Sequence, residues 1–428
     1  MIRMLPKFLL VGLILVASSQ LDAADPKGGE DWPGFRGPNR DDLSPDTGLL
    51  KVWDKNVSKP VWEASGLGVG YSSVAISGKQ LYTMGDLKDG CYVHALSRAD
   101  GKEVWKTKIG ETGGKTAAGP RSTPSVDGDS VFALGQHGNL VCLDTANGKV
   151  RWSKILTGEF GGSVPYWGYT ESPLVDGDKL VCTPGGKDST MIALNKKTGK
   201  VIWKGVVPSD EKAGETAGYS SIVIAEIGGT KQYVQLMANR VCGFSADKGE
   251  LLWRYGEGNK RFGSNTANIP TPIVKGEEIF VSAGYGRGGA MLQFTSSGGK
   301  FDVKEVYWDE KLNNKHGGII RVGDRLFGDS DDKGIPWCAD FATGKNIWKR
   351  EEGRDGSASM TYADGHLYIH FANGKVALVD ATAKTYEEIS SFKIPGAGGD
   401  SWAHPVVIGG KLYLREKDNL YVHDVKGR

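Results

Sequence analysis

Short apolar runs separated by glycine-containing turns fill most of the chain, a pattern that is typical of β-strands joined by hairpins. One such turn recurs in every unit of the pattern. Its glycines are Gly78, Gly128, Gly177, Gly228, Gly276, Gly323, Gly365 and Gly409. The mean step between them is about 47 residues, which four short strands and their turns would fill, and this is the size of a β-propeller blade. Eight copies therefore predict eight blades.

Five of the units contain an eleven-residue motif with a small residue first, Gly seventh and Trp eleventh. The copies are residues 95–105, 142–152, 193–203, 243–253 and 338–348. The third residue of each copy can hydrogen-bond the backbone of a turn. The seventh residue supplies the positive φ that a tight hairpin needs, and it is Gly101, Gly148, Gly199, Gly249 and Gly344 in turn. Each copy thus predicts a strand, a turn and a second strand that ends in a tryptophan.

The two ends of the chain predict a closed ring. The last unit, from Trp402 to Val425, has three strand-like runs, and the missing fourth strand precedes the first full unit around Trp62. Pairing this N-terminal strand into the last blade would remove free edges and latch the ring. The alternative, an open solenoid, leaves the split unit unexplained. Units five and seven are degenerate, because Trp308 falls out of register and Tyr386 stands near the expected Trp.

The eleven-residue motif resembles the tryptophan-docking motif of the pyrroloquinoline-quinone-like (PQQ-like) propeller repeat, A-x-D-x-x-T-G-K-x-x-W. The copy at residues 193–203 departs from it mainly in having Asn195 at the Asp position, and the resemblance extends from about Pro60 to Val425. It implies an all-β, eight-bladed β-propeller with tryptophan rings between neighbouring blades. The family contains quinoprotein dehydrogenases and non-catalytic propellers similar to the outer-membrane assembly factor BamB. Residues 31–40 (DWPGFRGPNR) also resemble the N-terminal signature of a large secreted subgroup.

The N-terminal residues are expected to lie outside the propeller. Arg3 and Lys7 precede an apolar stretch at residues 8–17, and small residues follow, which is the order of a secretory signal peptide. An uncleaved anchor is the alternative. We therefore expect a signal peptide at residues 1–24, an N-terminal extension at 25–59 and a propeller at 60–428. The mature protein is expected to be periplasmic or secreted, monomeric and without an integral membrane segment.

Composition agrees with this architecture and excludes several functions. The chain of 428 residues has 62 Gly, which the repeated turns require, and 12 Trp, which argue against disorder. Its 53 Lys and Arg balance 51 Asp and Glu, so nothing indicates nucleic acid or an anionic membrane as a partner. The five cysteines are 40 or more residues apart in strand-like contexts. We interpret them as small buried side chains, and a single disulfide stays open.

The family resemblance leaves two functions open. Quinoprotein dehydrogenases hold a planar quinone, a Ca²⁺ ion and an Asp base, and they often carry an adjacent-cysteine disulfide. This chain has no Cys-Cys pair and no haem-attachment motif. We therefore predict no cofactor and a secreted, non-catalytic binding or scaffolding propeller of the cell envelope, with a protein or a cell-surface polymer as its partner. The alternative is a PQQ- and Ca²⁺-dependent oxidoreductase acting on an alcohol or sugar. A carbohydrate-binding propeller is a third hypothesis, and it requires Trp167 and Trp402 to be accessible.

Propellers bind ligands at the mouth of the central funnel, beside the start of each innermost strand. The segments that precede these strands contain aromatic, cationic and hydrogen-bonding side chains that could hold a polar planar ligand or an extended peptide. The candidate ligand-binding residues are Tyr71, Arg121, Trp167, Tyr169, Glu171, Tyr219, Asn268, His316, Ser357, Trp402 and His404. Arg121 is the strongest candidate, because a cation near the axis attracts a carboxylate. The alternative is a structural ion pair between Arg121 and Glu171.

Three further motifs are interpreted as structural. Residues 329–334 imitate a calcium loop, but Lys333 would repel the ion and Asp340 belongs to a docking motif, so a solvated acidic turn is expected. His366 and His370 are four apart in a strand context, where this spacing does not build a ligand face. The glycine-rich residues 284–289 lack the following helix of a dinucleotide site and predict a loop at the rim. No metal site and no catalytic residue is predicted.

Overall fold

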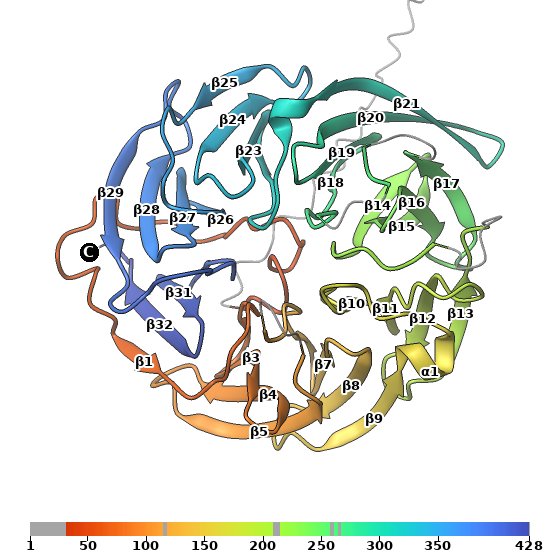
Figure 1. The fold of residues 1–428 in the computed structure, drawn as a ribbon, viewed down its shortest axis with the longest axis horizontal. Coiled ribbons are helices and arrows are strands. Elements are labelled where there is room, and N and C mark those ends of the chain that lie inside the picture. Colours follow the sequence, from red (N-terminus) through yellow and green to blue (C-terminus); the bar gives the residue numbers. More distant parts are fainter. Residues whose placement is uncertain (1–30, 114–117, 209–214, 257–260, 264–266, 428) are drawn as a thin grey trace, which may run out of the picture.

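The structure, a computed structural model, describes residues 31–113, 118–208, 215–256, 261–263 and 267–427. The expected signal peptide at residues 1–24 lies outside the described residues. The described residues form eight four-stranded antiparallel sheets arranged as blades around one central axis (Figure 1). The prediction of an eight-bladed β-propeller is confirmed.

The first four blades follow one another along the chain, each running from the axis outward. Blade 1 consists of β2 (Ala75–Ser77), β3 (Gln80–Leu87), β4 (Gly90–Ser97) and β5 (Glu103–Gly110). Blade 2 consists of β6 (Ser125–Asp127), β7 (Ser130–Leu134), β8 (Asn139–Asp144) and β9 (Val150–Ile155), followed by α1 (Leu156–Phe160). Blade 3 consists of β10 (Leu174–Asp176), β11 (Lys179–Cys182), β12 (Met191–Asn195) and β13 (Val201–Gly205). Blade 4 consists of β14 (Val223–Ile227), β15 (Thr230–Leu236), β16 (Val241–Ser245) and β17 (Leu251–Tyr255).

The last four blades have the same order, and the final one is completed from the N-terminus. Blade 5 consists of β18 (Ile273–Lys275), β19 (Glu278–Ala283), β20 (Gly288–Ser297) and β21 (Lys300–Asp309), followed by the 3-10 turn η1 (Glu310–Leu312). Blade 6 consists of β22 (Ile320–Val322), β23 (Arg325–Asp329), β24 (Pro336–Asp340) and β25 (Asn346–Lys349). Blade 7 consists of β26 (Ala358–Ala363), β27 (His366–Phe371), β28 (Lys375–Asp380) and β29 (Glu388–Lys393). Blade 8 consists of β30 (Val406–Ile408), β31 (Lys411–Glu416), β32 (Asn419–Asp424) and β1 (Trp62–Ala64).

The ring closes as the split last unit predicted. β1 pairs antiparallel with β32, with Trp62 opposite Val422 and Ala64 opposite Leu420. Figure 1 shows this strand beside the C-terminal blade. Because the outermost strand of blade 8 comes from the start of the chain and the other three from its end, the two chain ends hold the circle together.

The turn glycines of the docking motifs also receive the aromatic ring of the preceding blade. We call this ring, carried by the outermost strand, the docking ring. A methyl group built on Gly148 of blade 2 would lie 2.5 Å from Cε3 of Trp105 of blade 1. Trp105 also donates from Nε1 to the carbonyl of Thr145 at 2.8 Å. Docking rings cover glycines in the same way in the pairs Trp62–Gly101, Trp152–Gly199, Trp203–Gly249 and Tyr307–Gly344.

A comparison of two turn glycines distinguishes the cost of losing this packing from the cost of backbone strain. Gly148 (φ 69°) and Gly128 (φ 58°) are both left-handed, but a methyl group on Gly128 would meet nothing within 4 Å. We expect Gly128→Ala to lower the free energy of unfolding by about 1–2 kcal/mol, the cost of left-handed backbone. Gly148→Ala should cost about 1–3 kcal/mol more, because Trp105 must move. Urea unfolding of the two variants measures the difference, and equal midpoints would contradict the packing argument.

Blade 5 takes its docking ring from an unexpected residue. The sequence singled out Trp308, but Tyr307 faces Gly344 and donates its hydroxyl to the carbonyl of Phe341 at 2.7 Å. Trp308 lies under the guanidinium of Arg261, at 4.5 Å from Cζ to the ring centroid. Since successive side chains of a strand point to opposite faces, only one of the two neighbours can reach the next blade.

Blade 7 receives its docking ring from the N-terminal extension. Its outermost strand, β29, contains no tryptophan, and Tyr386 packs edge-on against Trp348 of blade 6 instead. In blades 1, 2, 5, 6 and 8, an aromatic residue of the second strand faces the docking ring at centroid distances from 5.8 to 6.5 Å. Tyr368 of blade 7 faces Trp53 at 5.7 Å. Trp53 therefore fills the place of the missing tryptophan.

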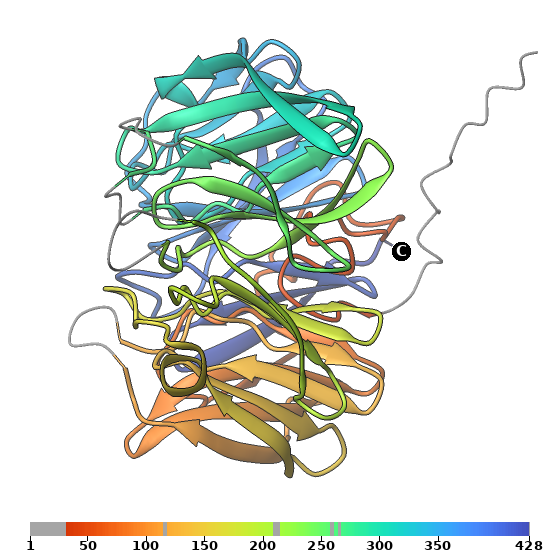
Figure 2. The same cartoon turned by 90° about the vertical axis from the view of Figure 1, so that its right-hand side faces the viewer.

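The first part of the extension, residues 31–44, crosses the central axis, and we call it the floor segment. The carbonyl of Pro33 accepts from Val126 of blade 2, and Arg40 donates to the carbonyl of Ser172 of blade 3. Further bonds reach Ile319 of blade 6, Tyr362 of blade 7 and His404 of blade 8. Figure 2 shows this segment, in red, toward one side of the ring. A segment bonded to blades on opposite sides of the ring closes that end of the central channel.

The cysteines are packing residues. All five are buried, and no disulfide joins any two of them: Cys91, Cys142, Cys182, Cys242 and Cys338. Burial raises the pKa of Cys338 to about 12, so its thiol is held in the neutral form.

Candidate functional site

A cavity of about 540 Å³ lies on the propeller axis above the floor segment. All eight blades contribute to it through the segments that precede their innermost strands, and Phe35 and Arg36 of the floor segment complete it. We call this cavity the funnel. Its volume is typical of small-molecule sites.

Most of the candidate residues line the funnel. These are Tyr71, Arg121, Trp167, Tyr219, His316, Ser357, Trp402 and His404. Trp167 and Trp402 are both half-buried rather than fully enclosed. The lining also includes Tyr285, Lys315 and Asp332, which the sequence did not single out as ligand-binding residues.

Three candidates lie behind the lining instead. Tyr169 is buried in the core between blades 2 and 3 and donates its hydroxyl to the carbonyl of Pro184 at 2.7 Å. Asn268 is fully buried and donates to the carbonyls of Met237 and Ala238. Glu171 is also buried, beneath the funnel wall. The segments are irregular, so residue type alone does not show which side chains face the axis.

Four planar side chains form one continuous stack on the funnel wall. The ring of Trp402 lies between His316, at a centroid distance of 3.9 Å, and Tyr71, at 4.5 Å. The guanidinium of Arg121 lies 5.2 Å over the far face of the Tyr71 ring. The stack joins segments of blades 2, 1, 8 and 6, so it links the start of the propeller to its end. Both faces of the Trp402 indole are covered by side chains of the protein itself.

Arg121 is held by the stack and by backbone carbonyls. It donates from Nη1 to the carbonyl of Trp167 at 3.2 Å and to that of Gly119 at 3.3 Å. Burial lowers the pKa of its guanidinium. The described side chains of Arg121 and Glu171 form no ion pair, so Arg121 does not join the blades in that way. Glu171 accepts from Gln235 at 3.0 Å and faces Arg40 of the floor segment.

Burial raises the pKa of Glu171 from 4.5 to about 7. Between these two values the folded protein binds a proton that the unfolded chain has released, so stability falls as pH rises. Through this group, the wild type should lose about 2–3 kcal/mol of unfolding free energy between pH 5 and pH 8. The Glu171→Gln variant, which has no carboxyl group to titrate, should not show this loss. Urea unfolding at several pH values measures the slope. The exposed Glu63→Gln is the control, and a Glu171→Gln variant with the wild-type slope would contradict the assignment.

One wall of the funnel holds a polar cluster. Asp332 pairs with Lys315 at 2.6 Å and accepts from the hydroxyl of Ser357 at 2.8 Å. His316 Nδ1 lies 3.1 Å from the same hydroxyl and 3.6 Å from Asp332. Burial and the charge of Lys315 lower the pKa of His316 to about 3, so the ring is neutral. A Ser-His-Asp triad needs the two imidazole nitrogens to face different partners, and here both partners meet Nδ1.

The acidic loop at residues 329–334, beside this cluster, is less exposed to solvent than the sequence predicted. Asp329 is buried, and burial raises the pKa of its carboxyl to about 8. Asp331 accepts from the backbone N–H of Gly286 at 2.9 Å, which ties the loop to the glycine-rich rim. Asp340 caps the docking turn by accepting from Thr343. The loop therefore supports the funnel wall.

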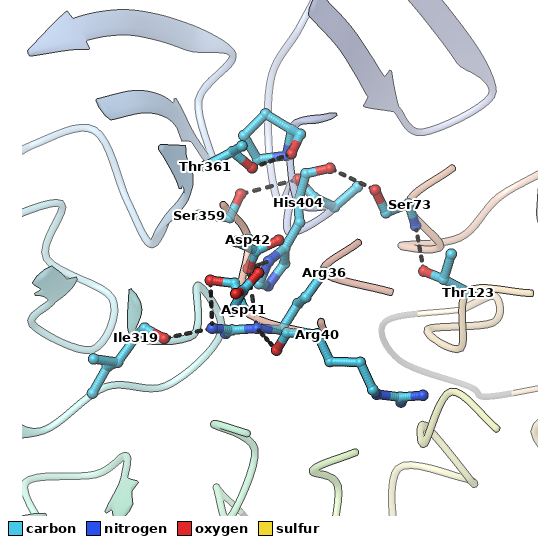
Figure 3. Close-up of polar contacts among 12 residues, drawn as sticks. Arg36, Arg40, Asp41, Asp42, Ser73, Thr123, Ile319, Ser359, Thr361 and His404 are labelled. Atoms are coloured by element: carbon cyan, nitrogen blue, oxygen red, sulfur yellow. Dashed lines mark hydrogen bonds and ion pairs between the residues drawn. The ribbon is translucent and has the colours of Figure 1, made fainter. Parts of the chain in front are cut away.

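The floor of the funnel is a buried charged group (Figure 3). Arg36 Nε pairs with Asp42 at 3.2 Å, and Nη2 donates to the carbonyl of Ile319 at 2.6 Å. Asp42 also accepts from His404 Nδ1 at 2.9 Å. Arg36, Arg40 and Asp42 all have positive φ, at 64°, 58° and 59°. Non-glycine residues in this region cost about 1–3 kcal/mol each, so the surrounding contacts must hold the turn in place.

A chain of hydroxyl groups joins the segments that precede the innermost strands of blades 1 to 4. Ser73 N–H donates to Thr123 Oγ1, Thr123 N–H to Ser172 Oγ and Ser172 N–H to Ser221 Oγ. The donors and acceptors are 50, 49 and 49 residues apart. This blade-length spacing of Ser and Thr is a sequence signal that could have identified the chain of hydroxyl groups.

Comparison with known proteins agrees with the propeller fold. Residues 89–350 match a family profile described as outer membrane protein assembly factor BamB. The chain belongs to the BamB family. The matched residues begin just before β4 and end just after β25, so they cover all five docking motifs.

Individual relatives are distant. BamB of Moranella endobia is 27% identical over 210 residues, 48% of this chain and 46% of the relative. Tetrathionate hydrolase of Acidithiobacillus ferrooxidans is 23% identical over 335 residues, 75% of this chain and 53% of the relative. The chain thus spans about half the length of these two curated relatives. BamB of Yersinia pestis is 22% identical over 391 residues, 86% of each chain.

Solved structures share the fold. BamB from Moraxella catarrhalis has a TM-score of 0.58 at 15% identity and covers 86% of this chain and 98% of its own. Quinohemoprotein alcohol dehydrogenase from Comamonas testosteroni has a TM-score of 0.68 at 14% identity and covers 95% and 82%. Among the described residues, no helix has the length and apolar character to cross a membrane.

The side chains around Trp402 do not fit a stacked planar quinone. A ring system inserted between two aromatic rings would need a separation of about 7 Å, twice a carbon contact distance. The centroids on either side of Trp402 are only 3.9 and 4.5 Å away. The nearby carboxylate of Asp332 is paired with Lys315, whose charge opposes a Ca²⁺ ion.

Proposed function

We propose that the chain is an exported, monomeric, non-catalytic binding propeller of the bacterial cell envelope, which holds a protein or a cell-surface polymer at its funnel. The observation that carries this proposal is the funnel itself, which all eight blades and the floor segment build. Its aromatic and hydrogen-bonding lining can hold a partner. Membership of a family described as an assembly factor also supports a binding role.

The geometry of the polar groups also supports a binding role rather than a catalytic one. His316 faces Ser357 and Asp332 through one nitrogen, so it is not placed to pass a proton between them. Both faces of Trp402 are occupied by neighbouring rings. The alternative of a PQQ- and Ca²⁺-dependent oxidoreductase therefore has less support than binding.

Quinone reconstitution tests the enzymatic alternative directly. Purified protein is mixed with micromolar PQQ and Ca²⁺, and the bound chromophore and dye reduction with ethanol or glucose are measured. We expect neither in the wild type. The Trp402→Ala variant, which opens the stack, shows whether the side chains themselves block the site. Quinone uptake by the wild type together with dye reduction would refute the proposed function.

Co-sedimentation with cell envelopes tests the binding role. We expect the purified protein to sediment with envelopes prepared from its own host, and Trp167→Ala with Tyr285→Ala to release it. Both residues line the funnel, and Tyr285 is 50% exposed. The matched control is Tyr92→Ala, an aromatic on β4 of blade 1 that does not line the funnel. Equal sedimentation of the double variant would exclude the funnel as the contact.

A further inference from the structure

The floor segment makes the funnel a one-ended site. It bonds to blades on opposite sides of the axis, with Arg40 donating to Ser172 of blade 3 and Arg36 to Ile319 of blade 6. A long polymer therefore cannot pass through the ring. What enters the funnel is a small molecule or the end of a chain.

The charges around the funnel balance. Arg36 pairs with Asp42, and Lys315 pairs with Asp332. Arg121 and Asp400 add one charge of each sign to the lining, and the lowered pKa of His316 keeps that ring neutral. Because these charges sum to zero, the funnel favours neither a strongly anionic nor a strongly cationic ligand.

The floor of the funnel offers both a hydrogen-bond donor and a hydrogen-bond acceptor, and both are held in place. Nδ1 of His404 lies 2.9 Å from Asp42, and in the neutral tautomer that donates from Nδ1 the Nε2 of this funnel-lining ring can accept from a ligand. Nη1 of Arg36 has no hydrogen-bond partner although the side chain is only 2% exposed and lines the funnel. A buried donor without a partner is costly, and a ligand group could satisfy it. Hydroxyl groups both donate and accept, which suits this arrangement.

Aromatic rings surround the mouth above this floor. Trp167 and Tyr285 line it, and Tyr166, which is 79% exposed, packs edge-on against Trp167 at 4.7 Å. Exposed aromatic side chains beside a cavity indicate a contact surface. Apolar ring faces at the mouth and paired donors and acceptors at the floor are complementary to a sugar, which has apolar C–H faces and a rim of hydroxyls.

We propose that the funnel binds the end of a neutral glycan chain, with Arg36 and His404 holding the terminal sugar and Trp167 and Tyr285 packing against the next one. The proposal rests on the proposed binding function and names its ligand class. An extended peptide is the competing occupant, and the test below includes it.

Titration with defined probes tests the proposal. Cellobiose, maltose and N,N′-diacetylchitobiose are titrated into the full chain by calorimetry, with tri-alanine as the peptide probe. We expect saturable binding of at least one disaccharide and none of tri-alanine. Trp167→Ala and Tyr285→Ala should each weaken the sugar at least tenfold, whereas Tyr92→Ala should leave it unchanged. Because Tyr285 is 50% exposed and Trp167 is outside the buried core, their variants should keep the wild-type unfolding midpoint.

Three outcomes would overturn the proposal. One is no saturable binding of any of the three disaccharides. Another is saturable binding of tri-alanine alone, which would leave the proposed binding function standing with a peptide as the ligand. The third is sugar binding that both mouth variants retain, because the sugar would then bind outside the funnel. Quinone uptake with dye reduction is a separate result and would refute the proposed function itself.

Discussion

Replacing Arg36 with alanine should lower the free energy of unfolding by about 3–5 kcal/mol, the cost of breaking a buried ion pair by removing one partner. Arg36 and Asp42 are 2% and 0% exposed. Without the guanidinium, Asp42 keeps only His404 as a partner, and the carbonyls of Ile319 and Arg40 lose their donor. The left-handed turn of the floor segment would then lose the contacts that hold it.

Urea unfolding followed by tryptophan fluorescence measures this loss. Lys51→Ala is the matched control, since Lys51 belongs to the same extension and pairs with Asp364 at 2.6 Å, but its side chain is 55% exposed. An exposed pair of this kind contributes about 0–1 kcal/mol. If both variants unfolded at the same denaturant concentration, the buried pair would not be what holds the floor segment.

Trp53→Ala should also destabilise the protein by about 3–5 kcal/mol, which is the usual cost of truncating a buried tryptophan. The indole packs on Tyr368 and on Phe392, at a centroid distance of 5.5 Å from the latter, and belongs to the core shared by blades 7 and 8. Its loss would leave a cavity where other blades have their own docking ring. The extension would then be held mainly through the floor segment.

The neighbouring residue provides the control for this variant. Val52 is 63% exposed, and Val52→Ala should change the unfolding free energy by less than about 0.5 kcal/mol. Trp152→Ala, which removes an ordinary docking ring, should cost about as much as Trp53→Ala. A Trp53→Ala variant as stable as the wild type would show that blade 7 needs no ring at this place.

The blade structure could be read from the sequence because each hairpin is specified locally. Gly128 and Gly148 both adopt the positive φ that their turns require, as the repeated glycines predicted. The pairing of Trp62 with Val422 was also predictable, since the split last unit leaves one strand at each end of the chain. These features depend on residues close in sequence or on a simple count of strands.

The docking rings of the two degenerate blades, 5 and 7, could not be predicted from local sequence. Tyr307 and Trp308 are adjacent, and only the direction of the strand decides which ring reaches blade 6. Blade 7 lacks its own tryptophan, and its substitute, Trp53, comes from more than 300 residues earlier in the chain. No local pattern connects them.

The repeat, the number of blades, the closure of the ring and the segments that face the axis all follow from the amino-acid sequence. Those follow from turn chemistry and strand alternation, which act over a few residues. Three features became visible in the folded chain alone: Arg36, Asp42 and His404 meet at the floor, Trp402 is stacked on both faces, and Glu171 lies behind the wall. These contacts join different blades, so they depend on how eight sheets pack around one axis, which no single stretch of sequence encodes.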